Sequence, residues 1–241
     1  MELYRPIVQH VHRRKDLASL ARTNKFIQIE AEKQLYRHIE IWEKSLEDNY
    51  EAYQRLLKLI ASNPRIASYV HSFSYEPSSP FVFISIGQAL HATTNLKRLL
   101  VYENTLGTPV LTPTMGVKSF KLEFVRFSTM EPMSKYLLEK LKQQSEVKEF
   151  EWFHDATFMS DGGQLDAPFP KLRVLSLWGP VGARATLQQQ RITSLSLDKQ
   201  VKNFKGKDVF GSVRSLRIYR AFAVQHAMWF PNLKYLWTTV C

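Results

Sequence analysis

The sequence has very little cysteine: Cys241 is the only one in 241 residues. An internal disulfide and a cysteine-based zinc site are therefore excluded, and we expect an intracellular compartment, the cytoplasm or the nucleus. Long apolar runs are also missing, since the longest, around Phe81 to Leu90, is interrupted by polar residues. The N-terminus lacks the basic and apolar regions of a secretory signal. We therefore expect neither a membrane segment nor export.

Glycine is scarce as well, with nine residues and one adjacent pair, Gly162-Gly163. The sequence contains no phosphate-binding loop, dinucleotide fingerprint or nucleophile elbow, all of which need glycine at fixed spacing. The seven histidines are dispersed, and His10 and His12 are two residues apart, a spacing that does not place both on one helix face. We therefore expect no enzyme activity, no cofactor and no metal site.

Acidic residues are outnumbered by lysines and arginines, 22 against 33, which gives a net charge of +11. A basic protein raises the question of nucleic acid as a partner. The excess lies mostly in the last third and is scattered among strand positions and acids, so a solvated face explains it. Nucleic acid is therefore an alternative that we expect less than a protein partner. Its candidate residues are Lys199, Lys202, Lys205, Lys207, Arg214, Arg217 and Arg220.

The sequence does contain a short repeated pattern, apolar-x-x-apolar-x-apolar. The steps between its starting residues run from 20 to 30, a spacing typical of leucine-rich repeats, in which each unit contributes one short parallel strand. FPKL at 169–172 and FPNL at 230–233 introduce two units, and proline there favours an extended entry. An ordinary α/β domain with apolar central strands is the alternative. The units begin at Val70, Leu96, Val117, Val147, Leu172, Ile192, Val213 and Leu233.

The pattern also predicts which face of each strand is buried. Positions 1, 4 and 6 of a unit should lie inside, where neighbouring repeats cover them. Alternation then turns positions 3, 5 and 7 outward, and aromatic residues with arginine, the residues favoured at protein interfaces, recur there. Cover by an adjacent loop is the alternative for each ring. The residues that we expect to bind a protein substrate are Tyr102, Phe153, Trp178, Arg217, Tyr219 and Trp237.

The segment 1–41 has a different, helical period and a characteristic order of side chains. Glu2-Leu3 comes first, Asp16-Leu17 follows, and Leu35-Tyr36 closes the segment, with Thr23-x-Lys25 in the second half. This order resembles the F-box, in particular that of fungal F-box/leucine-rich-repeat proteins. The family's opening Leu-Pro is absent ahead of Glu2, so we expect either that the chain starts late or that its adaptor binding is weakened. No capping unit follows the last strand, which also favours a longer parent sequence.

The resemblance implies a helical module that binds a Skp adaptor and, through it, a cullin. It also implies that the chain is a non-enzymatic substrate-recognition subunit of a Skp/cullin/F-box ubiquitin ligase. A leucine-rich-repeat scaffold that uses the helices only as a cap, without a role in ubiquitin transfer, is the alternative. The residues that the resemblance assigns to the adaptor are Leu3, Ile7, Val8, Val11, Asp16, Leu17, Leu20 and Thr23.

Together these observations predict an α/β fold in three parts. Residues 1–42 form a three-helix F-box-like module, and residues 43–69 form a linking helix. Residues 70–241 form an irregular leucine-rich-repeat solenoid with about eight short parallel strands, joined by helices or loops.

Overall fold

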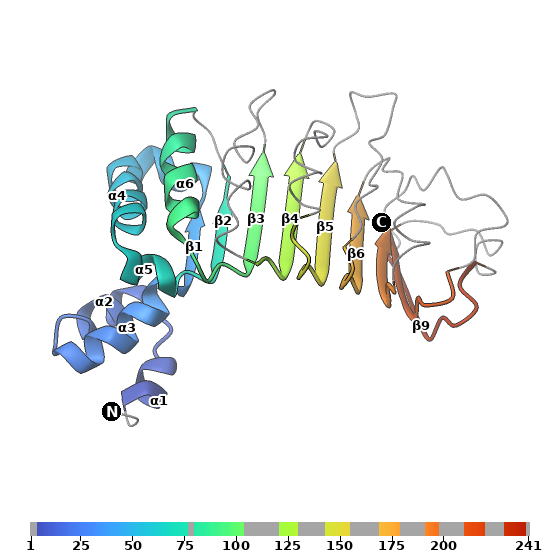
Figure 1. The fold of residues 1–241 in the computed structure, drawn as a ribbon, viewed down its shortest axis with the longest axis horizontal. Helices are drawn as coiled ribbons and strands as arrows, with labels where there is room; N and C mark the ends of the chain where they lie inside the picture. Colours follow the sequence, from blue (N-terminus) through green and yellow to red (C-terminus); the bar gives the residue numbers. More distant parts are fainter. Residues whose placement is uncertain are drawn as a thin grey trace. The chain divides into compact units, whose positions relative to one another are not determined.

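The computed structural model describes residues 4–76, 80–103, 121–129, 143–154, 169–178, 191–197, 210–219 and 229–239 (Figure 1). Its strands form one nine-stranded parallel sheet in chain order, β1 to β9, which confirms the α/β class with sequential short strands. The chain divides into two compact units, residues 1–100 with 117–120 and residues 101–116 with 121–241. The elements are α1 (Tyr4–Gln9), α2 (Arg14–Leu20), α3 (Lys25–Arg37), β1 (His38–Ile41), α4 (Glu43–Ser62), α5 (Pro64–Tyr69), β2 (Ser72–Tyr75), α6 (Pro80–Ala92), β3 (Arg98–Glu103), β4 (Phe124–Thr129), β5 (Glu149–His154), β6 (Val174–Trp178), β7 (Ser194–Leu197), β8 (Ser215–Tyr219) and β9 (Tyr235–Thr239).

The three inward positions of the repeat are buried as the pattern predicts. In the repeat of β5, Val147, Phe150 and Trp152 are all fully buried, and the strand begins two residues after the first of them. The parallel register places Phe150 beside Leu175 and Trp152 beside Leu177 of β6, so each repeat covers its neighbour's side chains. The same three positions are buried in the repeats that begin at Val70, Leu96, Leu172, Ile192 and Val213.

A recurring pair of hydrogen bonds fixes the entry to β3 and to β5 through β9. The carbonyl oxygen of the second residue of a repeat accepts from two consecutive backbone N–H groups of the next repeat. Arg214 O, for example, accepts from Lys234 N at 2.8 Å and from Tyr235 N at 3.0 Å. The second side chain then stands at the start of the strand, where it is exposed at Lys148, Arg173, Thr193 and Arg214 and half-buried at His71 and Glu123. The other accepting residues are His71, Glu123, Lys148, Arg173 and Thr193.

The sheet begins one strand earlier than the sequence pattern indicates. Strand β1 pairs in parallel with β2, and its Ile39 and Ile41 lie beside Phe73 and Tyr75. Both isoleucines are buried, so Tyr36 is the first residue of an additional repeat. The interval from Tyr36 to the next repeat is longer than in the other repeats, and helices α4 and α5 occupy it instead of a single linking helix.

The repeat expected at Val117 has a different register in the structure. Residues 117–120 lie outside the described part of the chain, whereas Leu122, Val125 and Phe127 fill the three buried positions around β4. The repeat therefore begins at Leu122, where the pattern had placed an inward sixth position. This correction makes the spacing more regular, with longer units up to Leu172 and shorter ones after it.

Strand β9 keeps the sequence pattern but not its burial. Leu236 pairs in register with Leu216 of β8, yet Leu236 is 51% exposed and Leu216 is fully buried. No strand among the described residues pairs with the outer edge of β9, so Leu236 lacks the strand neighbour that covers the earlier repeats.

The two leucines form a matched pair for measuring what a neighbouring repeat contributes. We expect Leu216→Ala to lower the free energy of unfolding by about 2 to 5 kcal/mol, because it leaves a cavity in the core. Leu236→Ala should change it by no more than about 0.5 kcal/mol, since that side chain remains largely in water. Urea unfolding followed by circular dichroism measures both, and equal losses would contradict the repeat packing described here.

Candidate functional site

Arg126 is the centre of a polar and aromatic cluster on the outward face of the second unit's strands. As the fifth residue of its repeat, it points away from the buried triplet and forms an ion pair with the carboxylate of Glu151 on β5. Its Nη1 donates to the hydroxyl of Tyr102 at 3.1 Å. The guanidinium also lies 5.6 Å from the ring centroid of Phe153 and 5.8 Å from that of Phe124. One cation thus joins an acid, a hydroxyl and two rings.

The electrostatics of this cluster keep Arg126 charged. Burial lowers the pKa of Arg126, but the hydrogen bonds to Glu151 and Tyr102 outweigh that effect and leave its pKa above the ordinary value. The side chains of Arg126 and Glu151 are 31% and 18% exposed, so both are held in place yet remain reachable from solvent. A charge that is already oriented loses less conformational entropy when a partner binds.

Two aromatic rings extend this cluster along the sheet. Phe153 and Trp178 face each other in the register of β5 and β6, and their rings are stacked with centroids 4.9 Å apart and planes at 20°. Both residues are partly exposed. The cluster and these rings form what we call the β4–β6 face, after the strands that carry all of its residues except Tyr102 of β3: Tyr102, Phe124, Arg126, Glu151, Phe153 and Trp178.

Of the outward residues predicted from the sequence, Tyr102, Phe153 and Trp178 belong to this face. Arg217 and Trp237 lie opposite each other on β8 and β9, further along the sheet, and both are exposed. Tyr219 belongs to β8, but its side chain is outside the described part. That these residues bind a substrate stays a prediction.

Arg126 and Glu151 were not among the residues predicted from the sequence, for different reasons. Arg126 was missed because the sequence pattern places the start of the repeat at Val117 instead of Leu122, and Arg126 then has no outward position. Once the repeat begins at Leu122, Arg126 falls at the outward fifth position. Glu151 was already at the outward fifth position. It belongs to the cluster because it pairs with Arg126 on the neighbouring strand β4, and a single sequence does not show which residues of two strands lie side by side.

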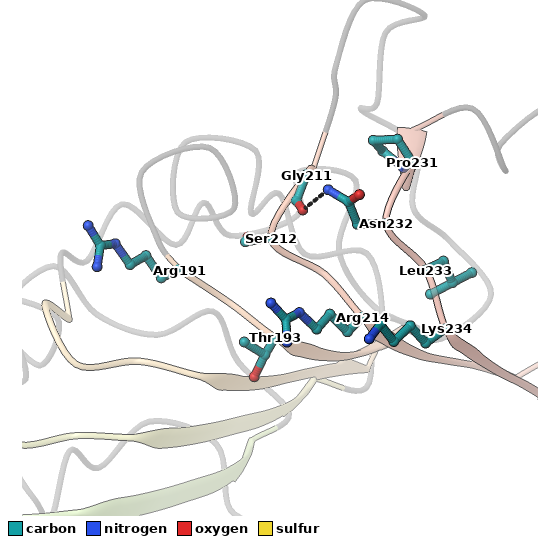
Figure 2. Close-up of a pocket in the computed structure, with 9 residues that line it drawn as sticks. All are labelled: Arg191, Thr193, Gly211, Ser212, Arg214, Pro231, Asn232, Leu233 and Lys234. Atoms are coloured by element: carbon teal, nitrogen blue, oxygen red, sulfur yellow. Dashed lines mark hydrogen bonds between the residues drawn. The ribbon is translucent and has the colours of Figure 1, made fainter.

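A basic pocket of about 860 Å³ lies at the start of strands β7 to β9 (Figure 2). Its cations are Arg191, Arg214 and Lys234, and Figure 2 shows the last two extending in the same direction. The amide of Asn232 donates to Gly211 O at 2.7 Å, which ties the start of β9 to the turn before β8. The remaining lining residues, Thr193, Ser212, Pro231 and Leu233, are uncharged.

Helices α1 to α3 pack around a small core of their own in the first unit. Val8, Leu17 and Ala31 are buried together, with Val11, Leu20, Ala21, Ile27 and Leu35 packed against them. The start of α3 is capped by Asn24, whose side-chain oxygen accepts from the backbone N–H groups of Phe26 at 3.0 Å and Ile27 at 2.9 Å. Outside this core, apolar side chains remain exposed: Ile7 by 63%, Phe26 by 50% and Tyr4 by 40%.

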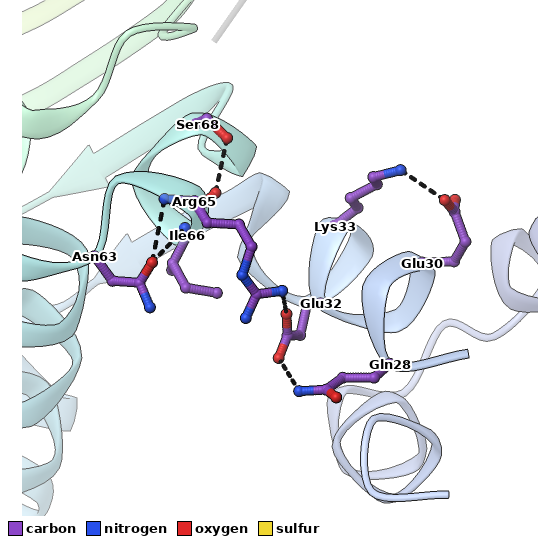
Figure 3. Close-up of polar contacts among 8 residues, drawn as sticks. All are labelled: Gln28, Glu30, Glu32, Lys33, Asn63, Arg65, Ile66 and Ser68. Carbon is purple, nitrogen blue, oxygen red and sulfur yellow. Dashed lines mark hydrogen bonds and ion pairs between the residues drawn. The ribbon is translucent and has the colours of Figure 1, made fainter. Parts of the chain in front are cut away.

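An ion pair connects α3 to α5 (Figure 3). The Glu32 side chain is 11% exposed, and its carboxylate accepts from Arg65 Nη1 at 2.5 Å and from Gln28 Nε2 at 2.8 Å. The bond to Glu32 raises the pKa of Arg65. Asn63 caps the start of α5 by accepting from the N–H groups of Arg65 and Ile66, so the helix that carries Arg65 is fixed at its first turn.

The residues assigned to an adaptor divide into two groups in the structure. Ile7, Asp16 and Thr23 are exposed, and Ile7 is the apolar one among them. Val8 and Leu17 are 2% and 4% exposed and hold the three helices together. Val11 and Leu20 are partly buried against that core, and Leu3 lies outside the described residues.

Comparison with known proteins finds no family model and no curated protein that matches this chain. Within the described ranges, no helix combines the length and apolar character that a membrane crossing requires. The same ranges contain no group of three or more histidine, cysteine, aspartate or glutamate residues placed to hold a metal ion.

The Glu32–Arg65 pair provides a test of how the three helices are held to α5. We expect Arg65→Met to destabilise the chain by about 1 to 3 kcal/mol, because the carboxylate of Glu32 stays buried without its cation. Lys33→Met is the control, on the helix that carries Glu32: it breaks the exposed pair with Glu30 and should cost less than about 1 kcal/mol.

Thermal and urea unfolding measure the stability of both variants. Adding Glu32→Gln to Arg65→Met removes the buried charge and should recover most of the loss. If Arg65→Met is no more destabilising than Lys33→Met, the ion pair does not connect the two helices energetically.

Proposed function

We propose that this chain is a substrate-recognition subunit of a Skp/cullin/F-box ubiquitin ligase and catalyses no reaction itself. In this proposal the N-terminal helices bind a Skp-type adaptor, and the outward face of the sheet binds a protein substrate. The proposal begins from the F-box order of segment 1–41 and is supported by how the side chains of that segment are distributed between core and surface.

The observation that carries the proposal is the contrast between Ile7 and Val8. Val8 is 2% exposed and belongs to the core of the three helices, whereas Ile7 beside it is 63% exposed. Phe26, at the start of α3, is also half exposed. Exposed large apolar side chains on a small helical module favour a binding surface, because burying them against a partner removes apolar area from water.

The β4–β6 face supports the second half of the proposal. Protein interfaces are enriched in tyrosine, tryptophan and arginine, and the residues that contribute most to binding lie in packed clusters of these types. Tyr102, Arg126 and Trp178 occur on one face, with Arg126 and Tyr102 already hydrogen-bonded. A substrate segment that carries an acid or an aromatic side chain would fit this surface.

The exposed Ile7 allows a test that does not disturb the fold. We expect Ile7→Asp to weaken binding to a purified Skp adaptor at least about tenfold, because a charge would be buried at the interface. Isothermal titration calorimetry with the full chain measures the affinity, and circular dichroism should show an unchanged melting temperature. Tyr50→Asp is the control, since Tyr50 is a similarly exposed apolar residue on α4, outside the three helices.

Leu17→Asp separates the role of the core from that of the surface. Leu17 is buried, so this variant should lower the melting temperature and lose adaptor binding together.

A wild-type chain that folds but does not bind the adaptor would remove the ligase role. The alternative, an interaction scaffold in which α1 to α3 serve only as a cap, predicts that result; it is favoured because Val8 and Leu17, two of the residues assigned to the adaptor, are buried in the helices' own core.

A further inference from the structure

The positive charge of this chain is concentrated at one end of the sequence. Residues 169–241 contain twelve lysines and arginines against two aspartates, a net charge of +10 out of +11 for the whole chain. Lys199, Lys202, Lys205, Lys207 and Arg220 lie outside the described residues. Among the described cations at this end, Arg191, Arg214 and Lys234 line one pocket.

The described residues around these cations do not neutralise them. None of the described residues from 169 to 239 is acidic. Earlier in the same unit the pattern differs, since Lys148 pairs with Glu123 at 2.9 Å and Lys171 pairs with Glu146 at 2.6 Å. Arg191, Arg214 and Lys234 form no ion pair with any residue in the described ranges. Within those ranges, the first repeats of this unit balance their charge and the last three do not.

The repeat geometry collects these cations in one place. Arg214 and Lys234 both stand at the second position of their repeats, at the start of the strand, and both are exposed. Strands β8 and β9 are neighbours, so the backbones of Arg214 and Lys234 are about 5 Å apart, measured across the strands. With Arg191, Thr193, Ser212 and Asn232 they line the basic pocket, a mixture of charged and neutral donors suited to phosphate oxygens.

Strand β9 carries two exposed aromatic rings beyond Lys234, outside the lining of the pocket. Tyr235 and Trp237 follow Lys234 closely along the strand and are 59% and 48% exposed. Their rings are stacked at 5.8 Å with planes at 20°, and Trp237 lies opposite Arg217 of β8. Trp237 is three residues beyond Lys234, about 10 Å along the strand. Cationic and aromatic groups therefore succeed one another on β8 and β9.

We propose that the repeats of β7 to β9 bind single-stranded nucleic acid, with phosphates in the basic pocket and a base stacked on the Tyr235–Trp237 pair. Single-strand-binding proteins combine cations that contact phosphates with aromatic rings on which bases stack, and β7 to β9 carry both: cations at the strand starts and exposed rings further along β9. This inference is independent of the proposed ligase role.

The rings favour a single strand over two other polyanions. In a duplex the base faces are already stacked on one another, so the phosphates would fit the pocket but the rings would have no partner. An acidic peptide would likewise use Arg191, Arg214 and Lys234 but would gain little from exposed Tyr235 and Trp237. Both become competing ligands in the experiment.

The test measures binding of the full chain by fluorescence anisotropy as a function of salt. The probes are labelled oligo(U) and oligo(dT) of about 20 nucleotides, a duplex of the same length and a polyglutamate peptide. Single strands should bind most tightly, with the logarithm of the affinity falling linearly as the logarithm of salt rises. Tighter binding of oligo(U) would indicate RNA as the ligand, and tighter binding of oligo(dT) would indicate DNA.

Charge-matched variants separate the pocket from net charge. Arg214→Gln with Lys234→Gln should weaken single-strand binding about tenfold and reduce the salt slope by about 1.4, which is about 0.7 for each lost phosphate contact. Lys148→Gln with Lys171→Gln removes the same charge from paired lysines and should change little. Trp237→Ala should cost about 5- to 150-fold with the salt slope unchanged, as expected for a lost stacking contact.

Three results would overturn the inference. One is the absence of salt-dependent binding to either single strand. Another is duplex or polyglutamate binding as tight as single-strand binding, which would assign the surface to a duplex or to an acidic protein. The last is an equal loss of single-strand affinity in the two charge-matched double variants, which would show that binding depends on net charge and not on the pocket.

Discussion

Each repeat of this chain contains three inward side chains that it cannot bury by itself, and the rest of the fold depends on how neighbours cover them. The parallel register places like positions beside one another, so Phe150, Leu175 and Leu195 lie at the same level of successive strands and are all fully buried. Each buried leucine, isoleucine or phenylalanine of this kind contributes about 1.5 to 3 kcal/mol. Leu236 marks the limit of this arrangement, because it has the right position in its repeat and no neighbouring strand among the described residues to cover it.

The same constraint decides what the molecule presents to partners. Fixing positions 1, 4 and 6 inside turns the fifth position outward, where Arg126 and Glu151 meet across two strands. The parallel register of β8 and β9, with Lys234 N donating to Arg214 O, makes Arg214 and Lys234 neighbours at the strand starts, where both are exposed. Within the second unit, the β4–β6 face and the basic pocket are therefore products of one repeated backbone geometry with different side chains.

Much of the fold was predictable from the sequence because inward positions are apolar and regularly spaced. Six of the eight expected repeats bury all three predicted residues. The missed strand begins near Tyr36, where helical and strand patterns overlap and the following interval is too long for the expected period. The error at Val117 arose because VKSFKL and LEFVRF both satisfy the pattern and lie close together, and burial alone separates them. The candidate surfaces were harder to predict, since the Arg126–Glu151, Glu32–Arg65 and Phe153–Trp178 contacts depend on pairings that distance along the sequence does not reveal.

Our central proposal is that Tyr4, Ile7 and Phe26, the exposed apolar side chains of α1 and α3, bind a partner, and that a different partner binds the described strands from β4 to β9. Hydrogen–deuterium exchange of the full chain, with and without a saturating Skp adaptor, tests this claim most directly. We predict slower exchange over residues 4–9 and 25–27 when the adaptor is present, and unchanged exchange over β4 to β9. Unchanged exchange in the helices, or protection that appears on those strands instead, would contradict the account.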